Sequence, residues 1–142
     1  MPILNARDQE AVRQEFQRIQ GPVKLVVFSQ ELVAGELCRQ NEALVREVAE
    51  LDDRISVEVL NPAIDRERAE AYGVDQVPAI VVEGARDYGL RFLGIPSGYE
   101  FSNLIDAIIV ASSGETGLSD DTKAALAELT GAVHIKVFST PT

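Results

Sequence analysis

Two side chains are of a type that could carry nucleophilic or metal chemistry. Cys38 is the only cysteine and His134 the only histidine, and they lie far apart in the chain. A thiolate is the nucleophile of disulfide exchange, so Cys38 is the first candidate for a reactive group. One cysteine cannot form an internal disulfide, and these two residues alone do not make up a zinc site, so we expect no metal. Cys38 as a small apolar core residue and Cys38 as a reactive monothiol both remain open.

A second feature is the sequence Val77-Pro78-Ala79, which opens an apolar run. A proline at the start of such a run is typical of the first residue of an edge strand, with no binding role. The sequence has no glycine-rich phosphate loop, no Ser-His-Asp arrangement and no dinucleotide fingerprint. We therefore expect no cofactor.

Strands and helices alternate around these residues. Residues 23–28 are almost wholly apolar and β-branched, which predicts a strand buried on both faces. Cys38 falls in a helix predicted over residues 35–51, whose apolar face is assigned to Leu37, Leu44, Val45, Val48 and Leu51. The other predicted helices are residues 6–20, capped by Asn5, and residues 65–72 and 99–112; the other strands are residues 55–60, 77–82 and 88–93.

This order of elements predicts an α/β fold. A helix joins the first two strands, so they should be parallel with a right-handed crossover. The last two strands follow each other closely and should form an antiparallel hairpin. We therefore expect a three-layer α/β/α arrangement, with a mixed four-stranded sheet and an extra helix at the N-terminus.

The chain after residue 113 has a different character. A break at residues 113–117 precedes a helix over residues 119–129, capped by Ser119, and then Gly131 and an apolar strand over residues 133–138. Helix, glycine and apolar strand is also the order in which the chain begins. We interpret residues 1–113 as one unit and residues 114–142 as the start of a second, so that the chain is part of a longer protein. The alternatives are that the last strand completes the first sheet or pairs with another copy.

The charge balance excludes some partners. The net charge is −10, from 23 acidic and 13 basic residues. Such a chain does not suit nucleic acid or an anionic membrane surface. The longest apolar run, residues 105–111 interrupted by Asp106, is too short to span a bilayer. A single cysteine fits a reducing compartment, so we expect a cytoplasmic protein.

Four features together resemble the thioredoxin superfamily. They are the buried strand ending at Phe28, the helix with Cys38, the Val77-Pro78-Ala79 strand start, and residues 94–101 (Gly-Ile-Pro-Ser-Gly-Tyr-Glu-Phe). In detail the chain resembles the N-terminal unit of the tandem, glutaredoxin-like protein disulfide oxidoreductases. It is also similar to the N-terminal domain of the flavoprotein component of alkyl hydroperoxide reductase. Residues 137–142 match the segment that stands before the Cys-x-x-Cys of the second unit in that family.

The resemblance implies roles for four residues. The family exchanges disulfides through Cys-x-x-Cys at a helix start, where the first cysteine attacks and the second resolves the mixed disulfide. The matching tetrad is Gly35-Glu36-Leu37-Cys38, which places Cys38 at the resolving position and Gly35 at the lost nucleophile. The family also implies a cis bond before Pro78, facing the cysteines. The main chain at Val77 would then pair with a bound substrate.

Three functions follow as hypotheses. The first is a redox-degenerate unit that scaffolds, or binds substrate for, an active Cys-x-x-Cys unit downstream, with protein thiols and disulfides or that unit as partners. The second is a stand-alone interaction module of the same fold, which leaves a homo-oligomer open. The third is a monothiol enzyme that uses Cys38. Without a cysteine at position 35, whether the chain is an enzyme is not decided by the sequence.

Overall fold

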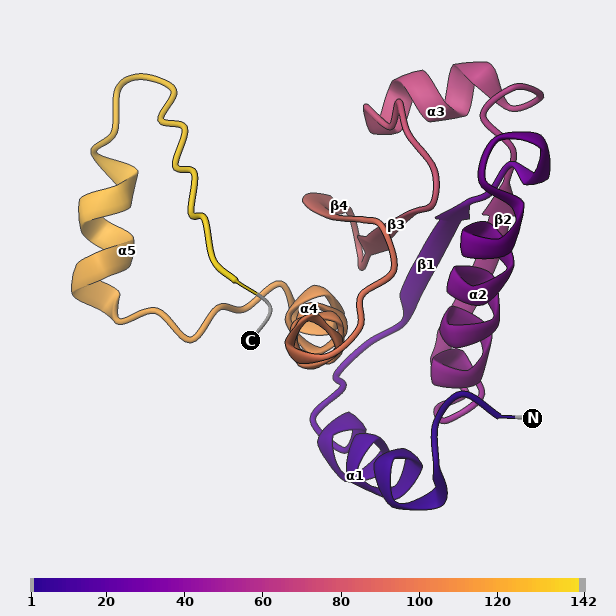
Figure 1. The fold of residues 1–142 in the computed structure, drawn as a ribbon. Coiled ribbons are helices and arrows are strands. Elements are labelled where there is room, and N and C mark those ends of the chain that lie inside the picture. The colour runs from indigo at the N-terminus through magenta and orange to yellow at the C-terminus, as the bar shows by residue number, and fades with distance from the viewer. Residues whose placement is uncertain (1, 141–142) are drawn as a thin grey trace.

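The computed structural model describes residues 2–140, and its centre is a mixed four-stranded sheet in the order β2-β1-β3-β4 (Figure 1). β1 (Val23–Phe28) pairs in parallel with β2 (Ile55–Leu60). On its other side β1 pairs antiparallel with β3 (Ala79–Glu83), which pairs antiparallel with β4 (Asp87–Leu93). The predicted α/β fold and mixed sheet are confirmed.

Helices cover both faces of the sheet. α1 (Ala6–Phe16), α2 (Glu31–Ala49) and α4 (Tyr99–Ser113) pack on one face, and α3 (Arg66–Tyr72) packs on the other. The alternation of side chains along β1 builds both cores, since Leu25 faces the three helices and Val26 faces α3. The main core draws on Val12, Phe16, Val23, Leu25, Val27, Leu44, Val45, Val48, Ile80, Val82, Leu104, Ile105 and Ile108.

α1 begins as predicted and ends earlier than predicted. The Asn5 side chain accepts a hydrogen bond from the backbone N–H of Asp8 (2.9 Å), which caps the helix. The helix stops at Phe16 rather than at residue 20. The Arg54 guanidinium donates to the carbonyls of Phe16 (3.1 Å) and Ile19 (2.7 Å), which supplies the partners that another helical turn would have supplied.

α2 contains a kink that the sequence did not predict. It begins at Glu31, four residues before the predicted start, but Ala34 has non-helical angles (φ −146°, ψ 50°), so the regular helix starts at Gly35. Leu37, predicted on the apolar face, is 52% exposed. Cys38 and Asn41 are fully buried and form the buried face at this end of the helix. Leu37 lies on a different face of the helix and is directed toward solvent.

The last part of the described chain does not pack on the sheet. α5 (Asp120–Ala127) is capped by Ser119 as predicted, but it buries no residue. The strand predicted over residues 133–138 is absent: these residues have no regular structure, and all are exposed (Figure 1). The prediction is wrong for this chain because a strand needs a neighbouring strand to satisfy its backbone groups.

None of the helices within residues 2–140 is long and apolar enough to cross a membrane.

Candidate thiol site at the end of the sheet

Several loops meet where β1 ends. Phe28 pairs with Leu60 of β2 and with Ala79 of β3. The backbone N–H of Ser29 donates to the Leu60 carbonyl (2.9 Å), and that of Gly94 donates to the Pro78 carbonyl (2.9 Å). The start of α2, Pro78 and the loops after β2 and β4 therefore lie at the same end of the sheet.

Cys38 is enclosed at this end. The residue is fully buried and its thiol is free. The sulfur accepts a hydrogen bond from the backbone N–H of Gln30 (3.4 Å), and the thiol donates a longer one to the Gln30 carbonyl (3.8 Å). Disulfide exchange requires a sulfur that a second sulfur can approach, so the folded chain does not present this thiol to a substrate. Gln30 was not predicted to contact Cys38, because no sequence pattern marks a backbone partner.

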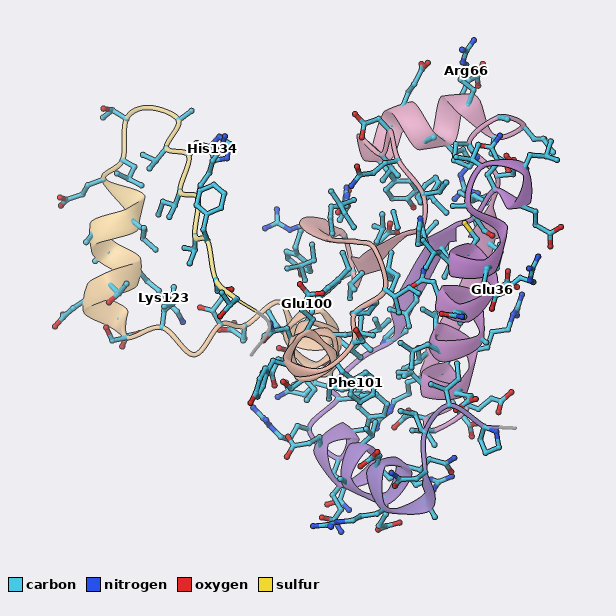
Figure 2. The ribbon with its side chains drawn as sticks, in the orientation of Figure 1. Glu36, Arg66, Glu100, Phe101, Lys123 and His134 are labelled. Carbon is cyan, nitrogen blue, oxygen red and sulfur yellow. The ribbon has the colours of Figure 1, made fainter. Side chains whose placement is uncertain are left out.

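Gly35 lies three residues earlier, at the start of the regular helix. A cysteine here would sit among free helix N–H groups, which favour a thiolate. A β-carbon built at Gly35 would meet only the flexible Arg39 guanidinium, at 3.3 Å, so a side chain fits at this position. Beside it, the pKa of the Glu36 carboxyl is lowered by hydrogen bonds from Gln40 (2.8 Å) and Arg39 (3.0 Å). Glu36 is therefore a negative charge on the exposed side of α2 (Figure 2).

The peptide bond between Val77 and Pro78 is cis. Pro78 is buried and Val77 is half-buried, and β3 begins at Ala79, two residues later than predicted. The hydrogen bonds found within residues 2–140 leave the main chain of Val77 unpaired. Val77 therefore has backbone groups available to a partner, next to the end of β1.

Exposed apolar side chains surround a groove at the same end. The groove has a volume of about 560 Å³ and lies between the loop that leads into α2 and the loop that leads into α3. Leu32 on one wall is 98% exposed and Ile64 on the other is 80% exposed. Leu32 and Ile64 are therefore two exposed apolar side chains that line the same groove.

A larger groove of about 730 Å³ lies elsewhere, between α1, α2 and the loop before α4. It is mainly apolar and includes Leu44 and Phe101, the latter labelled in Figure 2. The Glu47 carboxylate accepts from the backbone N–H groups of Ile3 (2.6 Å) and Leu4 (2.9 Å), which fixes one wall. None of the four predicted site residues lines this groove.

A polar network that the sequence did not reveal covers the α3 face. Glu58 pairs with Lys24 (3.0 Å) and with Arg68, and the pKa of Glu58 is lowered chiefly by the hydrogen bond from Lys24. The Tyr72 hydroxyl donates to Glu83 (2.7 Å), and burial raises the pKa of Tyr72. The hydrogen bonds of Cys38 go to Gln30 and not to these groups, so the network belongs to the sheet face rather than to the thiol site.

The structure brings Gly35, Cys38, Val77 and Pro78 to one end of the sheet and leaves His134 out. His134 is exposed on the segment after α5 (Figure 2). Within residues 2–140 no cluster of His, Cys, Asp and Glu side chains could hold a metal ion.

The mixed sheet with helices on both faces is a thioredoxin-like fold, although no family profile matches the chain. The alkylhydroperoxide reductase component AhpF of Enterococcus faecalis superposes with a TM-score of 0.80 and 23% identity, covering 89% of this chain and 61% of that one. A protein disulfide oxidoreductase from Aeropyrum pernix superposes with a TM-score of 0.78 and 25% identity, covering 92% and 57%. The predicted resemblance to these classes is confirmed.

Curated sequences agree with the fold. A probable thioredoxin of Methanothermobacter thermautotrophicus is 40% identical over 57 residues, which are 40% of this chain and 62% of the relative. An NADH dehydrogenase of Bacillus subtilis is 25% identical over 136 residues, which are 96% of this chain and 24% of the relative. The chain spans less than two-thirds of each of these relatives.

Proposed function

We propose that residues 2–113 are a redox-degenerate thioredoxin-like unit of a thiol–disulfide oxidoreductase. One observation carries the proposal: the helix start that suits an attacking thiolate holds Gly35, while the sulfur of Cys38 is fully enclosed. A unit of this kind cannot cycle between dithiol and disulfide by itself. Its role is then to scaffold, or to bind substrate for, an active Cys-x-x-Cys unit downstream, in a reducing cytoplasm.

The proposed second unit of the protein begins in residues 114–142. At one constant offset along the sequence, Gly131 matches Gly21, Val133 matches Val23 and Phe138 matches Phe28. The same offset also pairs Val137 with Val27 and Ser139 with Ser29. Val23, Val27 and Phe28 are fully buried in β1, whereas Val133, Val137 and Phe138 are exposed. An apolar segment with this pattern is what the first strand of a further sheet requires, and this supports the proposed domain division.

Substrate binding by this unit would use the end of the sheet. The unpaired main chain of Val77 offers hydrogen bonds to an extended segment, and Leu32 and Ile64 offer apolar contacts in the groove at the same end of the sheet. Protein thiols and disulfides are the partners that fit the proposed role. The same surface favours a second candidate, a stand-alone interaction module, for which the expected result is a stable complex or an oligomer of the isolated chain. The burial of Cys38 argues against a monothiol enzyme.

Reduction of insulin disulfides in dithiothreitol tests the proposal. The unaltered chain is expected to add nothing to the rate with dithiothreitol alone, and Gly35→Cys is expected to accelerate it. Leu37→Cys is the matched control, because it adds an exposed thiol on the same helix away from the helix start. An unaltered chain that reduces insulin would overturn the proposal, as would equal rates for the two variants.

A further inference from the structure

Asn41 is an unusual member of the core. It is fully buried in α2, and neither its side-chain nitrogen nor its side-chain oxygen has a hydrogen-bond partner within residues 2–140. Buried side-chain amides almost always have partners, because an unpaired buried donor or acceptor costs roughly 1–3 kcal/mol. Asn41 therefore requires a partner that is not one of the chain's own described groups.

The chemistry of Asn41 restricts what that partner can be. The amide offers donors and an acceptor, so the partner must both donate and accept. The next buried residues along α2 are Leu44, Val45 and Val48, all apolar. An ion in such surroundings would be strongly disfavoured without a countercharge. A small neutral molecule with both capacities fits, and in a protein interior that molecule is water.

We propose that Asn41 and Cys38 together bind one ordered water molecule between α2 and the sheet. The two residues are three apart on the same buried face of the helix. This spacing places their β-carbons about 5–6 Å apart, so the thiol and the amide are neighbours on that face. For this bond the hydrogen of the Cys38 thiol turns to the water from its long contact with the Gln30 carbonyl (3.8 Å), while the sulfur still accepts from the Gln30 N–H.

The site changes the interpretation of Cys38. A cysteine that serves only to fill an apolar gap would have no polar neighbour in its pocket. Cys38 instead has a backbone N–H on one side, from Gln30, and the proposed water on the other. The water lies in the interior of this unit and is independent of the proposed redox-degenerate function, so either proposal can fail while the other holds.

Infrared spectroscopy of the thiol tests the proposal, because the chain has only one cysteine and therefore one S–H stretching band. Asn41→Leu cannot hold the water, so the thiol hydrogen is expected to return to its longer contact with the Gln30 carbonyl and the S–H band to shift to higher frequency. The matched control is Gln40→Leu, the same amide-to-leucine change at an exposed position of α2, which is expected to leave the band unchanged. An unmoved band in Asn41→Leu, or an equal shift in both variants, would overturn the proposal.

A second measurement uses the unaltered chain, so the test survives if Asn41→Leu does not fold. In a proton NMR experiment the side-chain amide protons of Asn41 are expected to show a cross-peak to water. Its sign should be the one that marks a long-lived bound water molecule. Absence of that cross-peak would reject the water site, as would a protein group bonded to the Asn41 amide in a crystal structure.

Discussion

The backbone N–H of Gln30 donates a hydrogen bond to the sulfur of Cys38 (3.4 Å), so the residue before α2 covers the thiol that lies within the helix. This contact covers the sulfur with a backbone group and not with a side chain. Exposure of the Cys38 thiol therefore requires Gln30 to move away from it.

The first prediction follows from this enclosure. Alkylation of Cys38 by iodoacetamide in the folded chain is expected to be slower than in the urea-unfolded chain by more than about tenfold, since reaction requires local opening. A time course of labelling followed by mass spectrometry measures this. Leu32→Cys in a Cys38→Ala background is the control and should label at the unfolded rate, because Leu32 is 98% exposed. Equal rates for folded and unfolded Cys38 would contradict the prediction.

A second prediction concerns the turn between β3 and β4. A β-carbon built at Gly84 would clash with the Ala111 carbonyl oxygen of α4, so no side chain fits without a backbone shift. Gly84→Ala is expected to lower the free energy of unfolding by about 1–3 kcal/mol, as overpacking typically does. Urea unfolding followed by circular dichroism measures the change. Gly117→Ala, where a β-carbon meets nothing within 4 Å, is the control, and an equal effect of both changes would contradict the explanation.

The third prediction concerns pH. The pKa of Asp87 is lowered chiefly by the hydrogen bond from the Arg91 side chain, and the pKa of Asp52 is lowered chiefly by that from Arg54. A carboxyl whose pKa is lower in the folded than in the unfolded state stabilises the fold above its unfolded pKa, about 3.9 for Asp. That contribution is lost as the pH falls through the folded pKa, so stability should fall on acidification below about pH 4.

Urea midpoints measured between pH 7 and pH 3 check this. Asp87→Asn removes one of the two groups, so the loss of stability between pH 4 and pH 3 should be smaller in this variant than in the unaltered chain. Asp53→Asn serves as the control, because Asp53 is an exposed carboxyl next to the Asp52–Arg54 pair but not part of it. This variant should lose as much stability between pH 4 and pH 3 as the unaltered chain. An unchanged slope in Asp87→Asn would reject the assignment to the Arg91 pair.

Local patterns in the sequence were enough to predict most of the fold. The apolar run at residues 23–28 and the caps at Asn5 and Ser119 are signals within a few residues, and each is confirmed. The early end of α1 was not predictable in this way. It depends on Arg54, which is distant in sequence and reaches the carbonyls of Phe16 and Ile19 only after the fold has formed.

The site was predictable in its location and less so in its detail. The resemblance placed Gly35, Cys38, Val77 and Pro78 together, whereas the kink at Ala34 and the cover by Gln30 depend on backbone conformation that residue types do not specify. Asn41 could have been noticed, because a polar residue three positions after Cys38 interrupts the apolar face of a helix.

The last prediction concerns the boundary near residue 113. α5 and residues 133–138 bury nothing, and Lys123 and Lys136 are exposed there, with Lys123 labelled in Figure 2. Trypsin cleaves backbone that can open locally, so brief digestion should cut after these two lysines well before it cuts after Arg54 or Arg91. The fragment that remains should keep the circular dichroism and the cooperative urea unfolding of the sheet domain, because its core residues all precede residue 113.

Arg39, exposed on α2, is the internal control for exposure without local opening and should resist cleavage. Simultaneous cleavage at Arg39 and Lys123 would mean that the tail opens no more readily than α2. Loss of cooperative unfolding once the tail is removed would mean that residues 114–140 stabilise the sheet domain. Either result would contradict the proposed division of the chain.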